Sequence, residues 1–408
     1  MSLALVFNPG SNSLKFELVE LPDGQRVASE ARKLASVGID DIGKAAKLSV
    51  YATSGHAITS EAAVDVGDMA AATMTALQWL RDEQTTRDGM RDLRLAGVRV
   101  VHGGEAYASA VRVDARVRQD IERFEALAPL HNKSSLDILD AIAKELPEVP
   151  ALVTFDTAFH RTMPETAWRY PIERATADRH GVRKFGFHGV SHRYMLEHYA
   201  NTLGKRPEEV SVVSLHLESG SSACAIQAGR SIDTTMGMTP LEGLMMGSRS
   251  GSIDPAIVPF LMEKEGASGE EILQLLNKRS GLIGIAGESL DTRVLAKRED
   301  EAAKLALAMF SYRVRLAVGA YLAALGDAEA VLSGGGIGEN SPWLREAVCE
   351  GLRGWGMELD REVNARSREG MVRISTGTSR LAAWAMPVEE GLQIAYECLA
   401  ALRVAGES

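Results

Sequence analysis

Two short turns rich in glycine and serine, one in each half of the chain, carry the residue types that bind phosphate. The first spans residues 7–15 (FNPGSNSLK) and the second residues 215–223 (LHLESGSSA). Each follows an apolar strand and precedes an alternating one. Such turns expose backbone N–H groups and short hydroxyls, which suit a phosphate better than a packed core. Two copies predict a duplicated fold that binds a polyphosphate between its halves.

Two arginines lie where a positive charge needs an anionic partner. Arg99 interrupts the apolar strand 98–101, a position that is costly unless the guanidinium meets a ligand anion or a carboxylate. A substrate contact and a structural salt bridge both remain open. Arg249 lies in the segment 234–251, whose apolar residues follow neither a helical nor a strand period, so a long loop is predicted. Such loops are uncommon unless they are functional. A ligand contact is therefore favoured over a flexible surface loop.

An aspartate and a histidine are further candidates for chemistry. Asp156 follows the strand 151–154, and ligand contacts gather at the carboxyl ends of strands in α/β sheets. Capping of a helix is the alternative for this residue. His188 and His192 are four residues apart, but Gly189 lies between them and no glutamate completes a zinc-protease pattern, so a metal site is not predicted. His188 fits either donation to an anion or packing among aromatic neighbours.

A third turn, residues 330–340 (AVLSGGGIGEN), joins a strand to a helix whose expected N-cap is Ser341, with Pro342 at the first helical position. Glycines at this place let a ligand approach the backbone closely, as nucleotides require. The segment is neither a Walker A loop nor a clean GxGxxG motif.

The elements that must position these residues alternate between strands and helices, which predicts α/β architecture. Proline-rich residues 147–150 and Pro387 mark the expected boundaries, giving one domain from 1–150 plus 387–408 and a nucleotide-binding domain from 151–386. The expected strands are 4–7, 14–19, 99–101, 151–154, 212–217, 223–227 and 330–332; the expected helices are 65–83, 133–144, 193–203, 268–276, 301–325, 343–354 and 388–404.

Composition narrows the class of protein. The chain has 408 residues, 45% hydrophobic and 25% charged, with a net charge of −10, which argues against nucleic acid or an anionic membrane as partner. Three widely spaced cysteines and the absence of a signal peptide indicate reduced thiols in a cytoplasmic protein. The apolar stretch 305–325 contains Arg313 and Arg315, which favours a buried helix over a membrane span.

Taken together, the ordered motifs between Asn8 and Glu390 resemble the acetate kinase family of acetate and propionate kinases, in the actin, hexokinase and Hsp70 fold group. The resemblance implies a two-domain α/β structure with a duplicated ribonuclease H-like core (the actin-like ATPase fold), usually a homodimer. It also implies phosphoryl transfer between ATP and acetate, giving acetyl phosphate and ADP with Mg²⁺ or Mn²⁺. Acetate is already ionised near neutral pH, so the task is to bring two anions together and stabilise charge on the migrating group.

The resemblance assigns roles to individual residues. Arg99 would hold the acetate carboxylate, His188 and Arg249 would stabilise the equatorial phosphoryl oxygens, and Asp156 would orient an arginine or a metal-bound water. The remaining positions are Val101, Leu130, Phe187 and Pro240 for the acyl pocket; Asn8 and Glu389 for the metal; Ser11, Ser13 and Lys15 for phosphate; and His216, Leu217, Glu218, Ser219, Gly220, Asp291, Thr292, Arg293, Gly336, Ile337, Gly338, Glu339 and Asn340 for the nucleotide.

The second phosphate turn departs from the family pattern His-Leu-Gly-Asn-Gly-Ser, because Glu218 and Ser219 replace the Gly-Asn pair. A carboxylate close to a triphosphate is repulsive unless a cation lies between them. Either Glu218 turns away, or it recruits a metal, or the donor is not ordinary ATP. A related acyl kinase that uses pyrophosphate or propionate, and a non-catalytic paralogue that binds nucleotide or acyl phosphate, are the alternatives.

Overall fold

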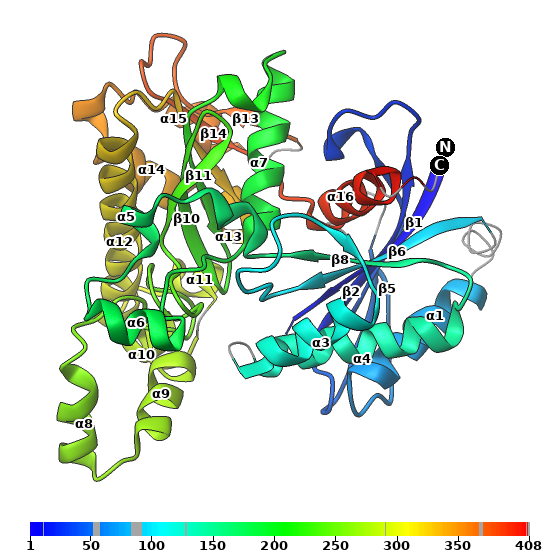
Figure 1. The fold of residues 1–408 in the computed structure, drawn as a ribbon. Helices are drawn as coiled ribbons and strands as arrows, with labels where there is room; N and C mark the ends of the chain where they lie inside the picture. Colours follow the sequence, from blue (N-terminus) through cyan, green and yellow to red (C-terminus); the bar gives the residue numbers. More distant parts are fainter. Residues whose placement is uncertain are drawn as a thin grey trace. The chain divides into compact units, whose positions relative to one another are not determined.

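The computed structural model describes residues 1–10, 12–51, 58–82, 92–126, 129–289, 291–366, 370–404 and 406, and it divides into two compact units (Figure 1). The first comprises 1–161, 189–198 and 389–408, and the second comprises 162–188 and 199–388. Each unit is built on its own sheet, with eight strands in the first and six in the second.

The first unit contains β1 (Ser2–Pro9), β2 (Leu14–Leu21), β3 (Arg32–Asp40), β4 (Lys47–Tyr51), β5 (Ile58–Ala63), α1 (Met69–Asp82), β6 (Leu93–Val100), β7 (Val111–Arg112), α3 (Ala115–Arg123), α4 (Pro129–Glu145), β8 (Ala151–Phe155) and α16 (Glu390–Val404). Helix α7 (Gly189–Thr202) begins in this unit. The second unit contains α5 (Glu165–Trp168), α6 (Arg174–His180), β9 (Val212–Leu217), β10 (Ser221–Gln227), β11 (Arg230–Thr234), α8 (Ile257–Glu265), α9 (Gly269–Lys278), α10 (Gly281–Ala286), α11 (Thr292–Leu295), α12 (Glu301–Leu325), β12 (Ala330–Gly334), α13 (Gly335–Asn340), α14 (Pro342–Glu350), α15 (Arg361–Ala365), β13 (Val372–Arg373) and β14 (Ala382–Ala385).

The two sheets repeat one topology. The order β3-β2-β1-β6-β8-β7 in the first corresponds to β11-β10-β9-β12-β14-β13 in the second. The directions also agree: β1 and β9 are antiparallel to the following strand, and each is parallel to its other neighbour, β6 or β12. The next pairs, β6 with β8 and β12 with β14, are parallel as well. The duplicated α/β fold predicted from the two phosphate-like turns is therefore confirmed.

Both faces of the first sheet are covered, so most side chains of its central strands are apolar and buried. Helices α1 and α4 pack on one face and α16 on the other (Figure 1). Phe7 and Phe16 belong to the core cluster beneath α1 and α4. On the α16 side, Gly97 allows close approach, since a Cβ there would lie 3.1 Å from Cys398 Sγ and 3.2 Å from Ile394 Cγ2.

Strand β8 pairs with β6 in the first sheet, and residues 151–161 group with the first unit. The boundary expected near residues 147–150 therefore differs from the division into units, which falls after Arg161. The assignment of functional domains to 1–150 plus 387–408 and 151–386 stays a prediction.

Helix α12 is the one helix in the described ranges that is long and apolar enough to cross a membrane by length and composition. Its inner stripe, which includes Phe310, Val314 and Val318, is fully buried against β9, β10, α10 and α14. That packing is typical of the core helix of a globular domain. The three cysteines are buried thiols, and burial raises the pKa of the Cys349 thiol to about 12.

Candidate functional site

The first group of predicted residues meets at one edge of the first sheet. Arg99 lies near the end of β6 and Asp156 directly follows β8, and these strands are parallel neighbours. The carboxyl ends of parallel strands lie at the same edge, so the register brings the two side chains together. The Arg99 guanidinium donates to both carboxylate oxygens of Asp156, with an Nε–Oδ1 distance of 2.9 Å. It also donates to Asn8 Oδ1 at 3.0 Å.

This ion pair is nearly enclosed, since Asp156 is 1% exposed and the Arg99 side chain 13%. The salt bridge that sequence reasoning left open for Arg99 is thus present, and its partner is the predicted Asp156. A bidentate contact fixes both the position and the plane of the guanidinium. The arrangement can hold an arginine rigidly at the sheet edge where ligands bind in α/β proteins.

A second carboxylate joins the cluster from the start of α16. Glu390 accepts a hydrogen bond from Asn8 Nδ2 at 2.6 Å and another from the Ser191 hydroxyl. Its neighbour Glu389, the residue predicted for the metal, contacts Lys33 instead, with Nζ 2.5 Å from Oε2. The structure therefore brings Glu390, which sequence reasoning missed, against Asn8. Two adjacent glutamates gave no signal that could separate them, because only the helix phase decides which one faces Asn8.

Lys33 belongs to a chain of alternating charges beneath this cluster. Glu17 Oε1 lies 3.1 Å from Lys15 Nζ and 3.6 Å from Lys33 Nζ, and it accepts from the Ser36 hydroxyl at 3.0 Å. Glu17 and Lys33 are only 2% and 5% exposed. Burial alone would raise the pKa of Glu17, but the two ammonium groups hold that pKa below its ordinary value. Lys15 has a raised pKa: burial opposes the shift, and nearby carboxylates, Glu17 foremost, cause it.

Gly391 is required by this packing. A Cβ at position 391 would lie 1.6 Å from Glu17 Oε2, so any larger residue would displace the buried carboxylate. In the first phosphate-like turn, Gly10 N donates to Ser13 O at 2.8 Å, which closes the hairpin between β1 and β2. Ser11 lies outside the described residues.

The second group of predicted residues lies in the second unit. The ring of His188 lies 4.6 Å from that of His216, centroid to centroid, and His188 Nδ1 is 2.9 Å from the Ser222 hydroxyl. His188 has a positive φ of 57°, a conformation that favours glycine and suits a functional position. Gly220 lies next to both His188 and Arg249, because a Cβ at position 220 would lie 3.7 Å from His188 Nε2 and 3.4 Å from Arg249 Nη1.

Arg249 is half-buried and its partners are weak. The guanidinium donates to Pro240 O at 3.2 Å and lies 3.8 Å from Met246 Sδ. Within the described ranges no carboxylate pairs with it, and burial lowers its pKa. A guanidinium stays charged at any ordinary pH, so this side chain presents an uncompensated positive charge. The arrangement can stabilise an anion.

The predicted nucleotide segments have mixed outcomes. Asp291 caps α11 by accepting from Arg293 N at 2.8 Å, and it also binds the Arg293 guanidinium; Thr292 is buried in that helix. Residues 335–340 form the short helix α13 directly after β12, where the sequence predicted a glycine turn, and Ser341 with Pro342 begins α14 as expected. Glu218 Oε1 accepts from Gly336 N at 3.1 Å, so its side chain turns toward the second predicted turn.

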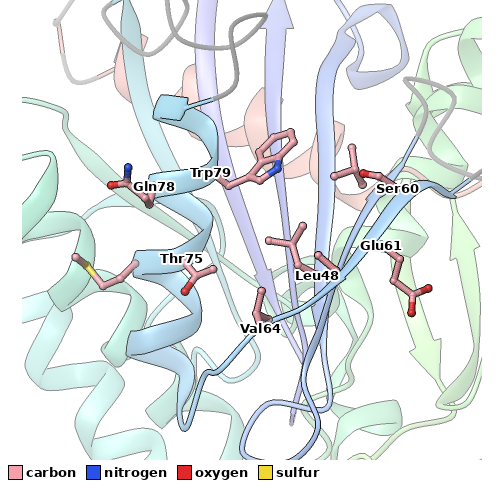
Figure 2. Close-up of a pocket in the computed structure, with 10 residues that line it drawn as sticks. Leu48, Ser60, Glu61, Val64, Thr75, Gln78 and Trp79 are labelled. Carbon is pink, nitrogen blue, oxygen red and sulfur yellow. The ribbon is translucent and has the colours of Figure 1, made fainter.

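The residues expected to line an acyl pocket are divided between the units. Val101 is buried in the first unit, whereas Phe187 is buried and Pro240 half-buried in the second. The side chain of Leu130 lies outside the described residues, and the pocket stays a prediction. The groove shown in Figure 2 is a different one: it lies between α1 and the β4–β5 hairpin and is lined by Trp79, Leu48 and Val64, none of them predicted for chemistry.

Comparisons with known proteins agree with one another. The model of the acetokinase family matches residues 3–396. An acetate kinase from Chloroherpeton thalassium is 41% identical over 412 residues, covering 97% of this chain and 98% of the relative, and one from Streptomyces coelicolor is 40% identical with 98% and 97% covered. Among solved structures, acetate kinase from Porphyromonas gingivalis has a TM-score of 0.89 at 36% identity, covering 98% of this chain and 100% of that one. A propionate kinase from Francisella tularensis has a TM-score of 0.87 at 33% identity, with 97% and 99% covered.

The buried ion pairs of Lys33 with Glu17 and Glu389 predict that removing Lys33 lowers the free energy of unfolding strongly. In the variant Lys33→Met, Glu17 and Glu389 keep their charges and lose a buried partner, which destabilises by about 3 kcal/mol. The control is Lys47→Met in the adjacent part of the same sheet, whose side chain is 60% exposed and pairs with Glu61; exposed pairs contribute about 0–1 kcal/mol. Urea-induced unfolding of both variants checks this. Equal urea midpoints for the two variants would show that the buried ion pairs of Lys33 add no more to stability than an exposed pair.

Proposed function

Because this chain belongs to the acetokinase family, we propose that it transfers a phosphoryl group between ATP and acetate, giving acetyl phosphate and ADP. It is an enzyme with the actin-like ATPase fold of its structural relatives. The observation that carries the proposal is Arg249, a half-buried arginine whose partners in the described residues are a carbonyl and a thioether. A charge placed in this way, beside His188 and Gly220, suits the oxygens of a migrating phosphoryl group.

In this proposal each residue has a role, and the roles of Arg99 and Asp156 are supported by their mutual contact. Arg99 holds the carboxylate of acetate, and Asp156 orients the Arg99 guanidinium through the bidentate contact. Orientation is a better role for Asp156 than proton acceptance, because acetate needs no general base and the carboxylate is already engaged by an arginine. His188 and Arg249 stabilise the equatorial oxygens, and Lys15 and Ser13 contact phosphate. Most of the rate enhancement comes from position and charge, as in other phosphoryl transfers.

The metal expected from the family is Mg²⁺, or Mn²⁺ in its place. The described residues hold no cluster of three His, Cys, Asp or Glu side chains with metal-site geometry. That fits Mg²⁺, which is bound through one or two carboxylates together with waters and substrate phosphates. When bound, the ion would supply positive charge that offsets the charge of the phosphate groups. The contact between Asn8 Nδ2 and Glu390 places Glu390 beside Asn8, which supports Glu390, in place of Glu389, as the carboxylate that would hold the ion with Asn8.

The assembly proposed from the family is a cytoplasmic homodimer. A second apolar stripe on α12 supports self-association, since Leu305, Tyr312 and Leu316 are 54%, 49% and 49% exposed on the face opposite the buried one. Contiguous exposed apolar side chains of this kind mark interaction surfaces.

The reaction and the role of Arg249 can be tested together. The wild-type protein should form acetyl phosphate from acetate with ATP, assayed beside GTP and pyrophosphate. Arg249→Ala should lower kcat by about a hundredfold or more, because it removes transition-state charge stabilisation and leaves the fold intact. Arg353→Ala, an exposed arginine of the same unit, is the control. Turnover like wild type in the Arg249 variant would remove this residue from the mechanism.

Substitutions at Glu389 and Glu390 separate the roles of the two adjacent glutamates. Glu390→Gln should raise the Mg²⁺ concentration needed for half-maximal activity by about tenfold, since a carboxylate ligand is lost. Glu389→Gln should lower stability more than it changes the Mg²⁺ requirement, because its partner is Lys33. Titrations of activity with Mg²⁺, paired with thermal unfolding, measure both effects. The reverse pattern would return the metal position to Glu389.

Self-association can be tested at the exposed apolar stripe of α12. Leu316→Glu places a charge in the exposed stripe of α12 and should shift the protein from dimer to monomer in sedimentation velocity. Val404→Glu, an exposed apolar residue of the first unit, should leave the dimer unchanged. A wild-type protein that sediments as a monomer would refute the proposed dimer.

A further inference from the structure

The turns after β9 and β12 lie side by side because the two strands are parallel neighbours, paired from Ala330–Val212 to Gly334–His216. The register places Glu218 and Gly336 at the same edge of the second sheet. There the Glu218 carboxylate accepts a hydrogen bond from Gly336 N, with Oε1 at 3.1 Å. Both residues are exposed, so this contact is open to a ligand in solution.

Gly335 makes the contact possible. It has a φ of +77°, and a Cβ there would lie 2.8 Å from Leu217 O and 2.9 Å from Glu218 Cγ. Any other residue would be strained in its backbone and would push the two turns apart. At Gly336, by contrast, a Cβ would meet only Glu218 Oε1, at 3.9 Å. Gly335 therefore leaves room for the turn after β9. Gly336 donates its N–H to Glu218 at the exposed surface.

The backbone of the turn that carries Glu218 is held in place. Ser221 Oγ accepts from Glu218 N at 3.2 Å and donates to Glu218 O at 2.8 Å. On the other side, Gly247 N donates to Ser219 O at 3.0 Å. Since these bonds hold the backbone on both sides, the Glu218 carboxylate would leave Gly336 by rotation of its own side chain.

We propose that Glu218 lowers the affinity for the phosphoryl donor, because its carboxylate competes with the donor for Gly336 N–H. Its carboxylate occupies the Gly336 N–H, a backbone donor of the kind that binds anionic or polar ligand groups. A polyphosphate or nucleotide that uses this turn must first displace the carboxylate and then bind next to its negative charge. Glu218 therefore weakens donor binding and leaves acetate binding unchanged. This inference rests on the proposed function, because it assumes that the donor binds at these turns.

The experiment compares Glu218→Gln and Glu218→Ala with wild type. Gln keeps the size of the side chain and an oxygen for Gly336 while removing the charge, whereas Ala removes both. Binding of ADP and ATP with Mg²⁺ is measured by calorimetry, and the KM values of ATP and acetate by the activity assay. Both Kd values should fall, by about threefold for Gln and about tenfold for Ala, as expected for loss of a charge-assisted competitor. The KM of acetate should not move.

The control variant is Glu263→Gln, which removes an equal charge from an exposed position of the same unit. Thermal unfolding verifies that all variants are folded. Unchanged nucleotide affinity in Glu218→Ala would overturn the proposal. Weaker affinity together with a higher Mg²⁺ requirement would also overturn it, by showing that Glu218 helps to hold a cation. A wild-type protein that binds ADP but transfers no phosphoryl group to acetate would refute the proposed function alone, and the affinities would still decide the role of Glu218.

Discussion

The parallel pairing of neighbouring strands is the constraint on which the rest of this molecule depends. It makes strands far apart in sequence end at one edge, and the chain places its polar side chains just beyond those ends. Arg99 and Asp156 meet because β6 and β8 are parallel, and Glu218 meets Gly336 because β9 and β12 are. One parallel pair in each sheet brings such side chains together, β6 with β8 in the first and β9 with β12 in the second. Because the sheet is duplicated, loops are brought together in this way in both units.

Local charge matters more here than net charge. The protein carries −10 overall, yet each unit holds positive groups where an anionic substrate is proposed to bind. In the first unit they are compensated by buried carboxylates, as with Lys15, Lys33 and Glu17. In the second, Arg249 has no carboxylate partner in the described residues. A compensated lysine is suited to holding a fixed geometry, whereas an uncompensated arginine is suited to meeting charge that arrives with the substrate.

Much of the fold could be predicted from sequence, because the central strands and long helices have strong periodic patterns. The strands near 4–7, 14–19, 151–154 and 212–217 are present, and so is the helix 301–325. Strands β7 and β13 have two residues each, and β5 is exposed throughout, so none has a pattern to detect. Strand β3 was missed for another reason: Lys33 interrupts its apolar pattern, and its buried position makes sense only once Glu17 and Glu389 are beside it. In the same way, sequence located Arg99 and Asp156 but could not pair them. It assigned the metal position to Glu389, because nothing in the sequence shows that Glu390 is the glutamate beside Asn8.

The first unit is discontinuous in sequence, and this shapes how the protein is made. Its sheet is complete once Phe155 has been synthesised, but the helix that covers its second face, α16, begins only at Glu390. Because synthesis proceeds from the N-terminus at about 5–20 residues per second, the ribosome must add the whole second sheet first. During that interval the strand face around Gly97 lacks its covering helix. The apolar strand face therefore stays uncovered until residues 390–404 have been made, and a variant without α16 would leave that face uncovered in the finished protein.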